Sequence, residues 1–510
     1  MYFSERAVRI KVHKQISLSK MWSVARCEYI KWITNPRNIV VIVLLIFIKT
    51  LFIDTLAQRA DRYGSPMNVL EPFIAVGNSW VAVLLLPSVF LVLMSDFPKF
   101  DGNSLFVICR SGKLNWLYGQ MLFAVMAVIS YIAVVFLAVV GMSVGNTVLG
   151  SSWSEAARFY AAKFPDEMNT FATLLLPENL YNQLDPICTI VHTLVLIILY
   201  LFLLSLVLLI CRISSGKMTG MFICTAVIAL GVATCALRSD LMWLFPMGNS
   251  IIWMHYTEII RDKADMVFLR LFRRYGSVAY IYEHIESKTI ERITSSGGKL
   301  MINTENLSLT INKTEILRDI TISFDKGKIH GLIGRNGSGK TMLMKCICGF
   351  VRATSGKVTV AGKEIGKDCD FPESTGVIIE TPGFIPYYSG YKNLKILADL
   401  GAKADKEDIC NAMRTVGLSP ELKRHVKKYS LGMRQRLGLA QAIMEDPDLL
   451  ILDEPMNGLD KDGVADMRRY LLDLKARGKT IIIASHSAED IEVLCDTVCE
   501  MDKGRLSVIR

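Results

Sequence analysis

The sequence predicts two domains: an α-helical transmembrane bundle over residues 1–299, then an α/β domain over residues 300–510. Two observations support this division. Apolar runs of about 20 residues, long enough to cross a bilayer, crowd the first half of the chain. In the second half, short β-rich runs alternate with turns and lead into a glycine-rich phosphate-binding motif. The chain of 510 residues is long enough for both domains.

Five mostly apolar segments have spanning length, near residues 39–57, 73–94, 118–142, 187–211 and 218–237. A sixth candidate, near 241–258, is shorter and contains Pro246, Gly248 and Asn249. We expect six spans, because the basic N-terminus and the domain with the glycine-rich phosphate-binding motif are both expected in the cytoplasm, which requires an even number of crossings. The 142–186 loop, with five acids against Arg158 and Lys163, has a net charge of −3 and is expected outside.

The charge of the N-terminus supports this topology. Residues 1–38 hold eight Lys and Arg residues against two Glu residues, a net +6 of the formal +10 of the whole chain. Basic segments beside an apolar helix stay on the cytoplasmic side. No groove-binding motif accompanies the charge, so a nucleic-acid partner is not expected. No cleavable signal peptide is evident, and we expect a multi-pass cell-membrane protein in contact with the lipid bilayer.

Two segments flank the predicted spans. In residues 17–34, Trp22 and Tyr29 recur at helical spacing among Lys and Arg, which predicts an interfacial helix ended by Asn35-Pro36. A cytosolic helix packed on the protein itself is the alternative. Residues 259–299 form a connector, either a helix on the membrane or a linker. The twelve cysteines lack metal-ligand spacing with histidines and are expected to be reduced thiols.

A phosphate-binding motif follows the strand predicted at Ile329–Ile333 and precedes a helical stretch. Its glycines let backbone amides wrap phosphate oxygens, and the helix N-terminus adds positive potential. Lys340 is expected to reach the β and γ phosphates of ATP, and the Thr341 hydroxyl to ligate Mg²⁺. The expected ATP-binding residues of the motif are Gly334, Arg335, Asn336, Gly337, Ser338, Gly339, Lys340 and Thr341.

Polar residues end two further predicted strands, Leu449–Leu452 and Thr480–Ala484. Asp453 is a candidate Mg²⁺ ligand after the first strand. Glu454 is a candidate catalytic base, able to accept a proton from the attacking water or to orient it. His486, after the second strand, is either a satisfied surface residue or a group that reaches the γ-phosphate and the water.

The motif YSLGMRQRLGLAQAI starts at Tyr429 and has Ser430 as a candidate helix N-cap. With it, residues 300–510 resemble the nucleotide-binding domain of ATP-binding cassette (ABC) transporters. The resemblance implies an α/β P-loop NTPase cassette with a helical subdomain. It also implies that Ser430 and Gly432 bind the γ-phosphate held by the P-loop of a second subunit. The loop Asn457–Asp460 is similar to the family's loop at the dimer interface, with Asp460 as its aspartate.

The chain departs from the family pattern at several positions. Leu431 and Met433 replace signature residues, and Ile311 stands where an aromatic residue commonly stacks on adenine. Glu380 replaces a glutamine, so it could ligate Mg²⁺ more strongly, or repel the γ-phosphate in the absence of metal. The pairing of SLGM with Glu380 resembles the subgroup that serves bacitracin resistance and lantibiotic self-immunity.

One chain holds one P-loop and one signature sequence, so the resemblance implies that two chains close on two ATP molecules. A homodimer is favoured because Lys340, Glu454 and His486 are all present, and a heterodimer with a related half-transporter is the alternative. The 95–117 loop, with Leu114, Trp116 and Leu117, is expected to transmit the closure to the groove near Glu380.

We therefore expect an ATP-driven exporter half-transporter that moves an unidentified hydrophobic, peptide-like or drug-like substrate out of the cytoplasm or membrane. The competing function is a membrane-anchored ATPase that signals, or removes a peptide from the membrane, without moving it across. The five apolar segments exclude a soluble P-loop regulator.

Overall fold

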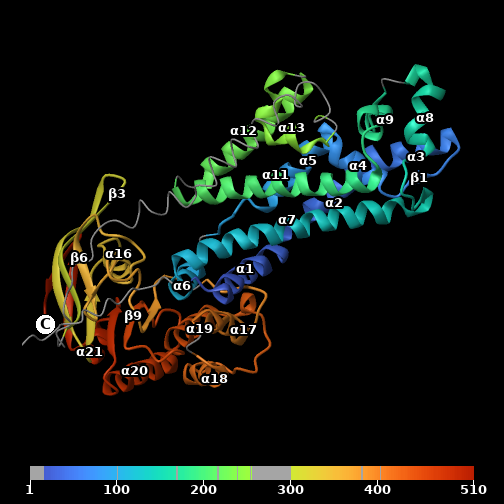
Figure 1. Cartoon of the computed structure of the whole chain (residues 1–510). Coiled ribbons are helices and arrows are strands. Elements are labelled where there is room, and N and C mark those ends of the chain that lie inside the picture. The colour runs from blue at the N-terminus through green and yellow to red at the C-terminus, as the bar shows by residue number, and fades with distance from the viewer. Residues whose placement is uncertain are drawn as a thin grey trace, which may run out of the picture. The chain divides into compact units, whose positions relative to one another are not determined.

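The structure is a computed structural model that describes residues 16–99, 102–167, 170–214, 217–237, 239–252, 254, 300–380, 383–401 and 404–510 (Figure 1). The chain divides into two compact units. The first comprises residues 25–99 and 120–291, and the second comprises residues 1–24, 100–119 and 292–510. The predicted connector, residues 259–299, lies outside the described residues. The domain boundary at 299/300 therefore stays a prediction.

Long apolar helices build the first unit. Four are long and apolar enough to cross a membrane: Pro36–Tyr63, Lys113–Ser143, Pro186–Ser214 and Met218–Ala236. A bent pair, α4 (Glu71–Asn78) and α5 (Trp80–Leu93), turns by 80° and makes a fifth if it counts as one span. All five predicted apolar segments are thus helical. The elements within them are η1 (Pro36–Asn38), α2 (Ile39–Ile48), η2 (Lys49–Ile53), α3 (Asp54–Tyr63), α7 (Lys113–Ser143), α11 (Pro186–Ser214) and α12 (Lys217–Ala236).

The sixth predicted span differs from expectation. Where residues 241–258 are described, they form part of the short 3₁₀ helix η5 (Asp240–Leu244) and the one-turn helix α13 (Pro246–Ser250). Pro246 lacks the N–H that would continue a helix from η5, so it opens a new turn instead. The described part of this segment therefore contains no helix of spanning length, and the described residues supply at most five spans.

The acidic 142–186 segment is folded against the span residues that precede it. It contains α8 (Glu155–Lys163), α9 (Phe171–Leu174) and α10 (Glu178–Tyr181). The buried Arg59 guanidinium donates hydrogen bonds to the Ala156 and Ala157 carbonyls at 3.1 and 3.0 Å. The buried Glu71 carboxylate accepts from the Ser154 N–H at 2.7 Å. Two buried charges thus fix the start of this segment, consistent with the rule that buried charges are paired or hydrogen-bonded.

Two sheets form the core of the second unit. An antiparallel sheet has the order β4-β3-β6-β7, and a second, mostly parallel sheet has the order β12-β11-β5-β10-β9-β8. The strands predicted at Ile329–Ile333 and Thr480–Ala484 are confirmed with the same bounds. The strands are β3 (Leu300–Ile311), β4 (Thr314–Asp325), β5 (Ile329–Ile333), β6 (Ser355–Val360), β7 (Lys363–Glu364), β8 (Thr375–Ile378), β9 (Leu449–Asp453), β10 (Thr480–Ala484), β11 (Thr497–Asp502) and β12 (Arg505–Val508).

Helices complete this unit, and three of them, α17 to α19, form a helical part distinct from the sheets (Figure 1). β5, β9 and β10 are buried nearly throughout, as near-continuous apolar strands of a covered parallel sheet should be. The helices are α16 (Lys340–Ile347), α17 (Gly390–Gly401), α18 (Lys406–Thr415), α19 (Leu431–Ile443), α20 (Lys461–Ala476) and α21 (Ala488–Leu494).

A segment from the N-terminal half of the chain also belongs to this unit. It comprises α6 (Gly102–Ser111) and the start of α7. Val107 and Trp116 are buried in the same apolar cluster as the strands of the second unit. The Arg110 guanidinium donates to the Glu445 carboxylate at 3.1 Å, and both side chains are largely buried. The described residues 102–117 of the predicted loop therefore pack on the nucleotide-binding domain through α6 and the start of α7. Their expected role in transmitting movement to the groove near Glu380 stays a prediction.

Candidate nucleotide site

The parallel sheet brings the predicted site residues together. β5, β10, β9 and β8 are adjacent and parallel, so their carboxyl ends lie at one edge of the sheet. The phosphate-binding loop follows β5, and His486 follows β10. Asp453 and Glu454 lie at the end of β9, and Glu380 lies after β8. This edge of an open α/β sheet is where ligands bind.

The phosphate-binding loop has a backbone that requires glycine at two positions. Gly334 has φ +139°, and a Cβ built there would lie 2.2 Å from the Met501 carbonyl oxygen. Gly339 has φ +117° and immediately precedes α16. The Ser338 side chain is only 6% exposed, and its hydroxyl has no hydrogen-bond partner among the described residues. A tight loop that opens a helix and holds an unsatisfied buried hydroxyl suits an anionic, oxygen-rich ligand.

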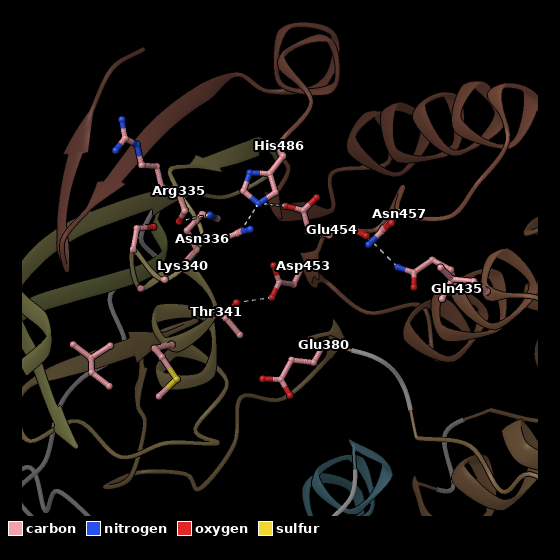
Figure 2. Close-up of a pocket in the computed structure, with 16 residues that line it drawn as sticks. Arg335, Asn336, Lys340, Thr341, Glu380, Gln435, Asp453, Glu454, Asn457 and His486 are labelled. Atoms are coloured by element: carbon pink, nitrogen blue, oxygen red, sulfur yellow. Dashed lines mark hydrogen bonds and ion pairs between the residues drawn. The ribbon is translucent and has the colours of Figure 1, made fainter. Parts of the chain in front are cut away.

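Two polar side chains of α16 point into the same region (Figure 2). The buried Lys340 ammonium donates to the Gly334 and Arg335 carbonyls, at 2.5 and 3.2 Å. The Thr341 hydroxyl donates to Asp453 Oδ2 at 2.8 Å, which joins the loop to the end of β9. The Lys340 ammonium and the hydrogen-bonded oxygens of Thr341 and Asp453 thus lie next to the loop glycines.

Glu454 and His486 form a second polar pair beside the loop (Figure 2). His486 Nε2 lies 3.3 Å from Glu454 Oε1 and 2.8 Å from Asn336 Oδ1. Burial raises the pKa of the Glu454 carboxyl, and the nearby His486 and Lys340 lower it in part. Glu454 also has φ +50°, a conformation uncommon for a non-glycine residue and worth attention at a site. A carboxylate with a raised pKa in a pocket is a candidate general base.

A cavity of about 580 Å³ encloses these groups. It lies within the size range of small-molecule sites. Eleven of the fifteen predicted site residues line it: Arg335, Asn336, Gly337, Ser338, Gly339, Lys340, Thr341, Glu380, Asp453, Glu454 and His486.

The other predicted residues lie elsewhere. Gly334, the first residue of the loop, packs against the Met501 backbone and does not line the cavity. The Ser430 hydroxyl accepts from the Met433 N–H at 3.1 Å and caps α19, which confirms the expected N-cap. Gly432 packs so closely on Gly458 that a Cβ added to it would lie 2.6 Å from the Gly458 carbonyl oxygen. Asp460 caps α20 and lies 3.3 Å from the Arg436 guanidinium. Ser430, Gly432 and Asp460 thus do not line the pocket of their own chain.

Glu380 lines the cavity but has a partner of its own. Its Oε1 lies 2.5 Å from the Lys345 ammonium on α16. The Glu380 side chain is 63% exposed, whereas that of Lys345 is 18% exposed. The residue also has φ +60°. The carboxylate that was expected to act as a metal ligand is therefore held in an ion pair.

Comparisons with known proteins identify the family of the C-terminal part of the chain. The sequence pattern of the family described as ABC transporter matches residues 317–457. An uncharacterized ABC transporter ATP-binding protein of Bacillus subtilis, YybJ, is 48% identical over 206 residues, which cover 40% of this chain and 94% of that relative. The chain belongs to the ABC transporter family.

Two further relatives match the same part of the ABC transporter chain. The bacitracin transport ATP-binding protein BcrA of Enterococcus faecalis is 43% identical over 208 residues, covering 40% of this chain and 68% of BcrA. The lantibiotic transport ATP-binding protein SrtF of Streptococcus pyogenes is 37% identical over 206 residues, covering 40% of this chain and 89% of SrtF. The C-terminal part is therefore an ABC cassette, which binds and hydrolyses ATP in a process coupled to transport.

Sequence reasoning missed other residues that line the pocket of the ABC cassette, among them Ile316 and Gln435. Asn457, which the sequence placed in the interface loop, also lines it. Gln435 Nε2 donates to the Glu454 carbonyl at 3.2 Å. Leu431 also lines the pocket, and Gln435 follows it by four residues on α19. This helical spacing, which puts both side chains on one face, was the sequence signal that could have found Gln435. Ile316, on β4, lines the pocket, whereas Ile311 does not.

The residues fit a divalent cation bound together with ATP. Thr341 and Asp453 offer the hard oxygen ligands that Mg²⁺ prefers. Nowhere in the described parts of the chain do three or more His, Cys, Asp or Glu side chains form a metal cluster. Mg²⁺ in nucleotide sites typically takes only one or two protein ligands, and phosphate and water complete its shell. The Thr341–Asp453 pair suits that arrangement.

Proposed function

We propose that this ABC chain is one half of a homodimeric exporter that hydrolyses ATP at sites shared between two chains. One observation supports the shared site above the others. The P-loop, Asp453, Glu454 and His486 line one pocket, whereas Ser430 and Gly432 lie outside it. A second copy could bring its own Ser430 and Gly432 to this pocket and receive the same in return, as an interface with two-fold symmetry requires.

The proposed roles follow from position. Lys340 and the loop amides would bind the β and γ phosphates, with Arg335, Asn336 and the loop glycines shaping the cradle. Glu454 would accept the proton of the attacking water, and His486 would orient that water and the γ-phosphate. Thr341 and Asp453 would hold Mg²⁺, which neutralises phosphate charge when bound. Asp460, next to the signature helix, would position the interface loop.

The substrate class is proposed from the relatives and the apolar helices. Two relatives are named for bacitracin and lantibiotic transport. The first unit contains long apolar helices with few charged residues. We infer a hydrophobic, peptide-like or drug-like substrate, moved out of the cytoplasm or the membrane, with the cassette on the cytoplasmic side where ATP is available.

The test begins with ATPase activity of the full chain in lipid nanodiscs, beside a Glu454→Gln variant. Hydrolysis by the wild-type chain alone, lost in the variant, supports the homodimer. A folded wild-type chain that binds ATP without hydrolysing it would contradict the homodimer and indicate a missing second half-transporter.

A second assay separates export from the alternative function. Inside-out sealed vesicles are given candidate peptides and ATP, and both ATPase stimulation and accumulation are measured. Accumulation supports export. Stimulation without accumulation would instead support a membrane-anchored ATPase that removes or senses a peptide.

A further inference from the structure

The pocket of the ABC cassette contains one more carboxylate than its permanent cations balance. Asp453, Glu454 and Glu380 line it, against Lys340 and Arg335. ATP itself is highly negative, so an unbalanced carboxylate in this position would oppose binding. The additional carboxylate is Glu380, at a position where the ABC family pattern has a neutral glutamine.

The structure supplies a compensating cation in Lys345. Its ammonium lies 2.5 Å from Glu380 Oε1. Lys345 follows Thr341 by four residues on α16, so both side chains project from one face of the helix, one turn apart. With Lys345 counted, three cations stand against three carboxylates around the pocket.

Lys345 is also held firmly enough to act at a defined place. Its side chain is only 18% exposed, although a lysine is usually solvated. Its backbone carbonyl accepts the Phe350 N–H at 2.8 Å, which fixes the end of α16. A shielded lysine at a fixed position loses less entropy in forming an ion pair than one on a mobile stem.

We propose that Lys345 is a positioning residue for nucleotide binding: it neutralises Glu380 and keeps this carboxylate from opposing the γ-phosphate. The inference rests on the proposed ATP site. In a chain without Lys345, Glu380 repels ATP that arrives without metal. Bound Mg²⁺ offsets part of that repulsion, so loss of Lys345 makes nucleotide affinity more dependent on Mg²⁺.

The test is a double-mutant cycle on the full chain in nanodiscs, with the non-hydrolysable analogue AMPPNP as the probe. Its dissociation constant is measured in EDTA and in excess Mg²⁺ for wild type, Lys345→Met, Glu380→Gln and the double variant. At low salt we expect Lys345→Met to weaken binding in EDTA by about two- to fivefold, the range for a partly exposed ion pair. The loss should be smaller in Mg²⁺ and largely absent in the Glu380→Gln background.

Lys345→Arg keeps the charge and should bind AMPPNP as wild type does, which separates the charge from a structural role of the side chain. The proposal is overturned if Lys345→Met binds AMPPNP as tightly as wild type does. It is also overturned if Lys345→Met weakens binding equally in the wild-type and Glu380→Gln backgrounds. Both results leave the proposed function intact. Failure of the wild-type chain to bind AMPPNP at all would instead overturn the proposed function as well.

Discussion

At the scale of single residues, the proposed role of Glu454 as general base predicts a pH dependence with a defined sign. Burial raises the pKa of its carboxyl above the ordinary value of 4.5. A general base works only when deprotonated, so turnover should fall as the pH drops through this raised pKa. We expect the acid limb of the kcat profile to lie at higher pH than an unperturbed glutamate would give. Circular dichroism at each pH separates this effect from unfolding, and constant kcat across the folded acidic range would contradict it.

Gly334 and Gly337 form a matched pair for testing the phosphate-binding loop. Gly334→Ala would bring a methyl group within 2.2 Å of a backbone oxygen, whereas a Cβ at Gly337 meets nothing within 4 Å. Both have positive φ. An alanine at Gly337, near the left-handed helical region, costs about 1–2 kcal/mol in backbone strain, whereas φ +139° at Gly334 lies outside that region. We expect Gly334→Ala to lower the apparent unfolding temperature and ATP affinity more than Gly337→Ala. Equal effects would show that the close approach to Met501 does not matter.

The sequence identified those site side chains whose roles can be read from a short contiguous motif. A glycine-rich loop between a strand and a helix predicts Lys340 and Thr341 without knowledge of the sheet. Lys345 and Gln435 were missed because their importance depends on Glu380 and Glu454, which are distant in sequence. Ile316 was missed for the same reason, since strand order decides which apolar residue faces the pocket.

At the scale of elements, α6 offers a test of how the N-terminal half is held to the cassette. The Arg110–Glu445 pair is largely buried, whereas Lys113, 2.7 Å from Asp370, is exposed. Arg110→Met would leave a buried carboxylate unpaired, at a cost of about 1–3 kcal/mol. Lys113→Met should cost about 0–1 kcal/mol, as surface ion pairs do.

The measurement is thermal unfolding of the full chain in detergent, with the two variants side by side. We expect Arg110→Met to lower the apparent midpoint clearly and Lys113→Met to leave it nearly unchanged. The opposite order would show that α6 is not anchored through Arg110. Substrate-stimulated ATPase activity, measured on the same samples, reports whether the anchored helix also transmits substrate binding.

The strands were easier to predict than the breaks in the apolar helices. Buried parallel strands are short apolar runs ended by polar residues, as at β9 and β10. The 80° bend between α4 and α5 was not predicted from the apolar segment 73–94. At the bend, the Asn78 side chain hydrogen-bonds Thr193 at 3.0 Å and the Ile252 N–H at 2.8 Å. Both partners lie more than a hundred residues away, so the contacts that hold the bend are absent from the local sequence. The local sequence offers only the cluster Gly77-Asn78-Ser79 as a signal for a break.

At the scale of the whole molecule, composition separates an apolar part from a nucleotide-binding part, but the compact units cut across that division. Residues 100–119 belong to the cassette unit although they lie between two apolar segments. The sequence indicated this loop, with Leu114, Trp116 and Leu117, only as a candidate for transmitting movement to the cassette. Which cassette residues receive them depends on the tertiary fold.

The proposed site shared between two chains predicts a result for mixed dimers that no single chain can test. Lys340→Ala removes the P-loop cation, and Ser430→Ala removes the signature hydroxyl, so each homodimer should lose hydrolysis at both sites. In a mixed dimer, one site receives both substitutions while the other combines a normal P-loop with a normal signature serine. Random pairing of equal amounts should therefore restore about a quarter of the wild-type rate if the two sites act independently.

Co-reconstitution of the two inactive variants, with ATPase activity measured against each alone, checks this expectation. The control mixes Lys340→Ala with Glu454→Gln, because both residues lie in the pocket of the same chain. Each site of that mixed dimer contains one damaged pocket, so activity should stay at background. Recovery in the first mixture but not in the second distinguishes a site shared between chains from one completed within a chain. No recovery in either mixture, with mixed dimers demonstrated by affinity tags, would favour strict coupling of both sites or a different partner subunit.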